Sequence, residues 1–172
     1  MFVGHFGLGL AAKKSAPAVS LGTLLLAAQF VDLLWPTFLL LGWERVAIEP
    51  GITTVTPLNF THYPISHSLL ASIGWGFLLG AIYYAIKRNT KASVIIGMLV
   101  VSHWFLDVIV HRPDLPIFPG GATLVGFGLW NSLGGTLVVE SLLFFGDYIF
   151  TCALQLRKML LAGMDLRALS CS

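Results

Sequence analysis

Residues 92–110 read ASVIIGMLVVSHWFLDVIV, and the chain continues as HRPD through residue 114. The run is long and apolar enough for a membrane-spanning helix, which needs about 20 mostly apolar residues. It nevertheless contains His103 and Asp107, and with His111 these residues repeat every fourth position, which places them on one helical face. An ionisable group inside a span costs roughly 2.5 to 3.5 kcal/mol. The stripe therefore indicates metal or proton chemistry.

The composition favours a membrane protein. Of the 172 residues, 56% are hydrophobic and 10% are charged, whereas soluble domains contain about 25% charged residues. The mean hydropathy is +0.85. We predict an all-α fold, a single membrane-embedded helical domain over residues 1–172. It would have a short N-terminal half-helix at 2–12, two ordered outer loops at 44–66 and 111–131, and four transmembrane helices, at 19–43, 67–86, 92–110 and 133–156.

The basic residues between the predicted spans give an orientation. They fall on one side of the bundle, at Lys13 and Lys14, at Lys87, Arg88 and Lys91, and at Arg157 and Lys158. Cytoplasmic loops are enriched in Lys and Arg, so we predict a multi-pass protein of the cytoplasmic (inner) membrane with both chain ends in the cytoplasm. The net charge of +2 shows no basic block suited to nucleic acid.

Other polar residues fall at a similar height in the predicted bundle. At about 1.5 Å per residue, Asp32 lies about 20 Å above the cytoplasmic edge, level with Asp107. Glu140 lies about 10 Å inside the fourth span from the outer side. His62 and His67 stand where the second span begins, and His5 lies in the half-helix. We expect these segments to converge on one layer.

The ligand types in this layer indicate a divalent metal. Nitrogen and oxygen donors without thiolates suit Zn²⁺, with Mn²⁺ or Fe²⁺ as alternatives, and more than four such donors can hold two ions. A carboxylate that does not bind metal can act as general base toward water. Glu140 and Asp107 are the two candidates for that role.

Four motifs, in order, resemble the bacterial inner-membrane metal-dependent hydrolase family. They are GH at 4–5, the mid-span Asp32, HYPISHSLL at 62–70 and SHWFLDV at 102–108. The arrangement is also similar to that of helical zinc-dependent phospholipases C. The family's acidic PDxDH segment is reduced here to Asp32, and its HRGxTH motif is HYPISH. The resemblance implies a set of metal ligands, namely His5, Asp32, His62, His67, His103 and Asp107.

The leading hypothesis is a membrane-embedded hydrolase that acts on an ester or phosphoester, with a lipid among the candidate substrates. Two other hypotheses stay open. In the first, the stripe relays protons or a cation in a small transporter. The inner half of the third span is apolar apart from Ser93, which favours a pocket open to one side. In the second, the protein is a non-catalytic membrane subunit with a structural metal.

Overall fold

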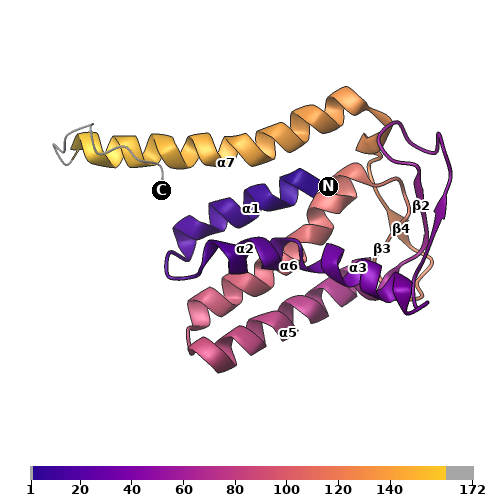
Figure 1. Cartoon of the computed structure of the whole chain (residues 1–172), viewed down its shortest axis with the longest axis horizontal. Coiled ribbons are helices and arrows are strands. Elements are labelled where there is room, and N and C mark those ends of the chain that lie inside the picture. The colour runs from indigo at the N-terminus through magenta and orange to yellow at the C-terminus, as the bar shows by residue number, and fades with distance from the viewer. Residues whose placement is uncertain (1, 162–172) are drawn as a thin grey trace.

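The computed structural model describes the backbone of residues 2–161 and the side chains of residues 3–146 and of Ile149. The fold is mostly helical, and Figure 1 shows the helices side by side with the loops gathered at one end. The helices are α1 (Phe2–Ser15), α2 (Leu21–Ala28), α3 (Phe30–Leu40), α4 (Pro64–His67), α5 (Leu69–Lys87), α6 (Thr90–Val110), the 3-10 turn η1 (Leu129–Asn131) and α7 (Leu133–Leu161).

Among the described residues, two straight helices, α5 and α6, are long and apolar enough to cross a membrane. The helices α2 and α3 pass the same test together, as one span bent by 55°. Of the four predicted spans, the described residues thus support two, or three with the bent pair. In α7 the searched part, Leu133–Gly146, is apolar but too short to cross, and the side chains of Arg157 and Lys158 lie outside the described ones.

The predicted first span is broken because its helix stops at Gln29. Gln29 has φ −101° and ψ 7° and joins α2 to α3. Further along, Pro36 lies inside α3, where it cannot donate the usual bond to the carbonyl of Asp32. Residues on both sides of the break are buried. After the break, α3 leaves the helical layer next to the loop end of the molecule (Figure 1).

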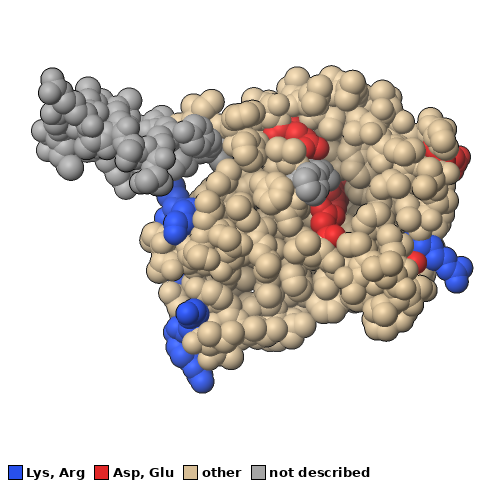
Figure 2. Space-filling model, viewed as in Figure 1, with Lys and Arg blue, Asp and Glu red and all other residues tan. Residues whose placement is uncertain are grey.

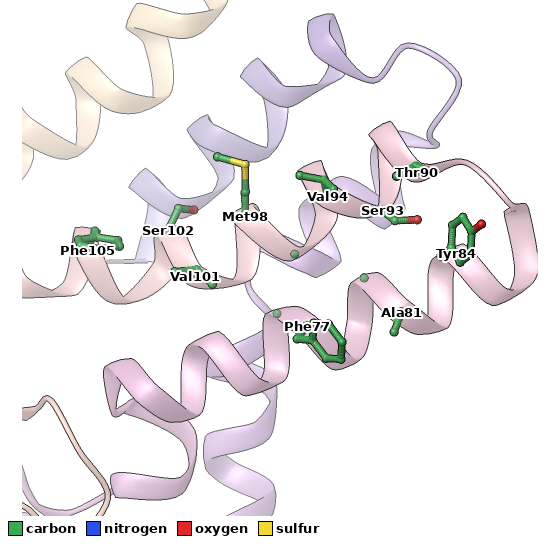
Figure 3. A pocket seen from close by; sticks show the side chains of 13 residues that line it. Phe77, Ala81, Tyr84, Thr90, Ser93, Val94, Met98, Val101, Ser102 and Phe105 are labelled. Carbon is green, nitrogen blue, oxygen red and sulfur yellow. The ribbon is translucent and has the colours of Figure 1, made fainter.

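The pair α5 and α6 packs closely through small residues. A Cβ added to Gly76 would lie 2.6 Å from the carbonyl oxygen of Gly97, and one on Gly80 would lie 2.9 Å from that of Ser93. The two backbones approach so closely only because these glycines have no side chain. Beside this contact lies a groove of about 780 Å³ (Figure 3). It is lined by Phe77, Met98 and other uncharged residues, and no His, Cys, Asp or Glu is among them.

The half-helix α1 is confirmed as a short helix and lies between α7 and α2 (Figure 1). Gly7 lies against the backbone of Leu143 in α7, and Gly9 against Leu25 in α2. The buried core between α2, α3 and α6 includes Leu24, Val31 and Ile96. Protein therefore covers α1, as a helix too short to cross requires.

The predicted outer loops are ordered, but they contain strands, so the all-α prediction needs correction. The strands β1 (Arg45–Ile48) and β2 (Leu58–His62) pair antiparallel, as do β3 (Leu115–Pro116) and β4 (Leu124–Val125). The loop after α6 returns to cap that helix, because Phe127 and Gly128 donate backbone bonds to Val108 and His111. These two ribbons form the end of the molecule seen on the right of Figure 1.

The charged residues are distributed unevenly along the molecule. Lys13 and Lys14 end α1, and Lys87, Arg88 and Lys91 surround the turn between α5 and α6, at the end away from the ribbons. Figure 2 shows basic patches at this end, whereas the acidic patches lie toward the middle of the face and the ribbon end, which also holds a basic side chain.

Candidate metal centre

Five of the six predicted ligands converge where α1, α3, α4 and α6 meet. The structure brings His103 and Asp107 together on successive turns of α6, and it adds side chains from the three other helices, namely His5, Asp32 and His67. Four of the five side chains are buried, and the side chain of Asp32 is 30% exposed. The cluster thus combines a dry interior with one partly accessible carboxylate.

The donor atoms around Asp32 lie close enough together to hold a metal ion. The Nε2 atoms of His67 and His103 both lie 3.4 Å from Oδ1 of Asp32. These three residues form a group whose ligand atoms all lie within 4.8 Å of one another. The same Nε2 atoms lie 3.8 Å and 3.2 Å from Oδ2 of Asp107. Ligands bound to zinc at about 2.0–2.1 Å in a tetrahedron are separated by about 3.3 Å, so the distances to both carboxylates are near those of a zinc site.

A hydrogen bond fixes the tautomer of His103. Its Nδ1 lies 2.9 Å from the carbonyl oxygen of Ala28, the last residue of α2 before the helix break. A carbonyl only accepts, so Nδ1 is the protonated atom and donates. Nε2 is buried and has no hydrogen-bond partner in the structure. In the neutral ring Nε2 therefore presents a lone pair toward Asp32 and Asp107.

A second chain of hydrogen bonds fixes His67. Its Nδ1 lies 2.7 Å from Oγ of Ser66, and that hydroxyl lies 2.6 Å from Oε2 of Glu44. The backbone N–H groups of Ile65 and Ser66 donate to the other oxygen of Glu44. Since the hydroxyl donates to the carboxylate, it accepts the proton on Nδ1 of His67. A carboxylate placed behind a ligand in this way is typical of metal-binding histidines.

The two fixed tautomers create an electrostatic requirement. Both Nε2 atoms then present lone pairs to carboxylate oxygens that also have only lone pairs. Acceptor atoms at 3.2 to 3.8 Å repel one another in a buried site unless a cation lies among them. The cluster can meet this requirement with a metal ion or with protons on the rings.

His5 lies on the other side of Asp107. Its ring stacks on that of His103, with centroids 3.7 Å apart, and its Nε2 lies 3.1 Å from Oδ1 of Asp107. His5, His103 and Asp107 form a second group whose donor atoms lie within 4.8 Å of one another. His5 can either orient Asp107 toward one ion or bind a second ion.

The structure does not bring His62 or Glu140 to the cluster. His62 is exposed at the end of β2, and neither metal-binding group includes it. Pro64 begins α4 directly afterwards, so the chain changes direction between His62 and His67. Glu140 accepts a hydrogen bond from the backbone N–H of Val3 at 2.9 Å. It caps the start of α1, where a negative charge is favourable.

A cavity of about 290 Å³ opens onto the cluster. Asp32, His67 and Asp107 contribute to its lining, together with the aromatic side chains of Trp35, Phe60 and Trp130. The exposed part of the metal-binding group therefore faces this pocket, which lies between the helices and the ribbons. The pocket has room for a small substrate group.

His111, the third residue of the predicted stripe, also lines this cavity. The ring is buried, and its Nδ1 lies 3.0 Å from Oδ1 of Asp114. The hydroxyl of Tyr63 donates to the same oxygen at 3.2 Å. Burial lowers the pKa of His111 and raises the pKa of Tyr63. Near pH 7 the imidazole is therefore neutral and the phenol protonated.

Sequence reasoning missed Glu44 and the pair of His111 with Asp114 as members of the site. Glu44 stands 23 positions before His67 along the chain, and no periodic pattern links it to that residue. Its burial, at 2% exposure, becomes visible only when the loop folds back onto α4.

The chain was compared with protein-family models, with curated proteins and with solved structures, and none of the three comparisons found a match. The functional interpretation therefore depends on the geometry of the cluster.

We expect Glu44→Gln to weaken metal binding about 10- to 100-fold, the usual effect of losing a carboxylate behind a ligand. The neutral amide no longer fixes the hydroxyl of Ser66 as a donor, so His67 loses its orientation. Competition with a chromophoric zinc chelator measures the affinity. Glu49→Gln is the matched control, because Glu49 is an exposed glutamate in the same loop. Equal affinities for all three proteins would exclude this role of Glu44.

Proposed function

We propose that this protein is a membrane-embedded metal-dependent hydrolase that acts on an ester or phosphoester. The main support is one observation. Two histidine Nε2 atoms with fixed tautomers and the carboxylate of Asp32 form a group that could hold a metal ion, and Asp32 faces a cavity. Such a site can bind an ion and leave one side open to water and substrate.

Zinc fits this set of donors best. Imidazole nitrogens and carboxylate oxygens are ordinary ligands for Zn²⁺, whereas Mn²⁺ and Mg²⁺ prefer six oxygen-rich ligands. Among the described residues neither metal-binding group contains a cysteine. A bound ion would supply a nucleophile at neutral pH by lowering the pKa of water, and it would polarise the bond that is cleaved.

The cavity favours a hydrolase over a purely structural metal site. Structural zinc sites are closed by four protein ligands, and catalytic sites keep a position for water. Here Asp32, His67 and His103 offer three ligands, and the partly exposed Asp32 and the space of about 290 Å³ beside it leave room for water in the fourth position. The aromatic lining suits a substrate that presents an apolar part beside its ester group. The resemblance of the four motifs to those of the bacterial inner-membrane metal-dependent hydrolases is consistent with this proposal.

The apolar stretch of α6 favours a hydrolase over a transporter. A transport path needs polar groups on both sides of the cluster, but α6 is apolar from Val94 to Val101, on the side of the basic turn. Ser93 on this side donates to the backbone of Asn89 within its own helix. The site is therefore a pocket open toward the ribbons.

The metal content of the purified protein tests this proposal. We expect zinc at about one ion per chain after a wash with a weak chelator, and loss of the ion in His103→Gln and Asp107→Asn, which each remove a ligand. Bis(4-nitrophenyl) phosphate is the first substrate probe. Its hydrolysis should stop when a strong chelator removes the metal and return when zinc is added. His62→Gln is the matched control, because His62 is exposed and lies outside both groups.

Three outcomes separate the hypotheses. A wild-type protein that remains metal-free after incubation with zinc, manganese and iron would contradict the proposal and favour protons in the cluster, as in a transporter. Stoichiometric metal without hydrolysis of phosphodiester or carboxylic ester probes would leave a structural metal site. Retention of the metal in both ligand variants would place the ion elsewhere.

We also propose that the site faces outward from the cytoplasmic membrane. The basic residues at the ends of α1, α5 and α6 lie away from the ribbons (Figures 1 and 2), and such residues are enriched on the cytoplasmic side. The ribbons and the cavity beneath them would then lie at the outer surface. Substrate would enter from the outer leaflet or from the aqueous space above it.

Cysteine labelling in intact cells tests this orientation. In a background with Cys152→Ser and Cys171→Ser, the reporters are Val55→Cys near the ribbons and Lys91→Cys at the basic turn, both at exposed positions. A membrane-impermeant maleimide should label Val55→Cys directly and Lys91→Cys only after the cells are permeabilised. The reverse pattern would show that the site faces the cytoplasm.

A further inference from the structure

Beside the candidate metal ligands, His111 lines the cavity, and it forms a second polar cluster with Asp114 and Tyr63. The hydrogen bond from Nδ1 of His111 to Asp114 is 3.0 Å long, and that from the Tyr63 hydroxyl to the same carboxylate oxygen is 3.2 Å. Neither metal-binding group includes any of these residues. The cluster lies beside the proposed site without belonging to its ligands.

The bond to Asp114 determines which nitrogen of His111 carries the proton and which one is left for a bound molecule. A carboxylate only accepts, so Nδ1 is protonated and the neutral ring has its lone pair at Nε2. His111 lines the cavity together with the ligands His67 and Asp107. Since Nδ1 is occupied by Asp114, Nε2 is the nitrogen left for a molecule in the cavity. A histidine held by a carboxylate in this way is a common acid–base arrangement.

The position of the His111 ring relative to the ligands is fixed. Its centroid lies 6.5 Å from that of His67, so a single bound group can contact both rings. The ring packs against Trp130 at 4.4 Å and Phe60 at 4.9 Å. The backbone N–H of His111 donates to the carbonyl oxygen of Asp107 at the end of α6. His111 and the ligand Asp107 are therefore held by the same helix end.

We infer that His111 is a catalytic acid–base residue that delivers a proton to the leaving oxygen of the substrate. This inference rests on the proposed hydrolase function. In the step, the oxygen of a water molecule forms a bond to the phosphorus or acyl carbon, and one water proton passes to Nε2 of His111. The bond from that centre to the leaving oxygen breaks, and Nε2 returns the proton to this oxygen. The products are an acid and an alcohol, and the imidazole is again neutral.

The need for this proton depends on the leaving group. A metal lowers the pKa of water by itself, so the transfer that still needs a protein group is the one to the leaving oxygen. A nitrophenolate leaves readily as an anion and needs little help. A phenolate, whose conjugate acid has a pKa of about 10 as in tyrosine, leaves poorly without a proton. Loss of His111 should therefore affect the two kinds of substrate differently.

The test compares methyl 4-nitrophenyl phosphate with methyl phenyl phosphate, using full-length zinc-loaded protein in detergent. We expect His111→Gln to lower kcat/KM for the phenyl ester about 10²- to 10⁴-fold, the usual contribution of general acid–base catalysis. The loss for the nitrophenyl ester should be less than about 10-fold, because its leaving group needs no proton. Zinc content should be unchanged, and His62→Gln, the matched histidine control, should resemble the wild type.

The results distinguish failure of this inference from failure of the proposed function. Equal losses for both esters, or no loss, would overturn the role of His111 while the hydrolase function stands. Loss of zinc in His111→Gln would overturn it as well, because His111 would then be a ligand. If the zinc-loaded wild type cleaves neither ester, the proposed function fails, and this role of His111 fails with it.

A second measurement does not depend on activity. ¹⁵N NMR of histidine-labelled protein should show His111 in the Nδ1–H tautomer in the wild type, and a mixture of tautomers in Asp114→Asn. The same variant should reproduce the leaving-group dependence of His111→Gln with a smaller loss. An Nε2–H tautomer in the wild type would contradict the inference, since Nε2 could then not accept the proton.

Discussion

The rest of the site depends on one buried carboxylate, that of Asp107. It lies within 3.8 Å of nitrogen atoms of His5, His67 and His103, and it is almost completely excluded from solvent. Transfer of a carboxylate into a protein interior costs several kcal/mol unless a cation or strong hydrogen bonds compensate. Because two of these histidines already use Nδ1 as a donor elsewhere, a cation between the rings and the carboxylates is the compensation that fits the geometry.

Several features of the fold follow from the need to hold this cluster. The break at Gln29 ends α2 next to the carbonyl that binds Nδ1 of His103, and it starts α3 where Asp32 can reach the other nitrogen of this ring, Nε2. A continuous helix would have placed the carbonyl of Ala28 in a bond with its own helix. The short helix α4 positions His67, and the buried Glu44 fixes its ring through Ser66. Irregular backbone is thus found where the ligands meet, and the straight helices α5 and α6 form the support.

The ribbon of β1 and β2 has a separate role. Leu58 and Phe60 of β2 line the cavity, and Phe60 and the adjoining Tyr63 contact the ring of His111. The return loop also caps α6, which keeps His111 in place relative to the ligands on the same helix. Asp32, His67 and Asp107 from the helices and His111 after α6 therefore line the same cavity.

The sequence was sufficient to predict the parts of the site that depend on helical periodicity. The spacing of His103 and Asp107 fixes their common face, and estimated depth placed Asp32 at the same level. Depth could not distinguish Glu140 from the ligands, because residues on different faces share the same height, and this one binds the start of α1.

The remaining features depend on tertiary structure. The 55° bend between α2 and α3 left no gap in the apolar pattern, so the predicted first span was continuous. The strand pairs are short, and their pairing depends on the turns and on the helices beneath them. Glu44 and Asp114 are ordinary loop acids until the chain folds back and places them behind His67 and His111.

X-ray absorption spectroscopy at the zinc edge, on zinc-loaded full-length protein, tests the central claim most directly. The cluster predicts nitrogen and oxygen neighbours alone, at about 2.0–2.1 Å, with the outer-shell scattering of at least two imidazole rings. A sulfur neighbour at about 2.3 Å would place the ion at a cysteine and contradict the claim. A spectrum without imidazole scattering would contradict it equally, because the histidines of the cluster would then not bind the metal.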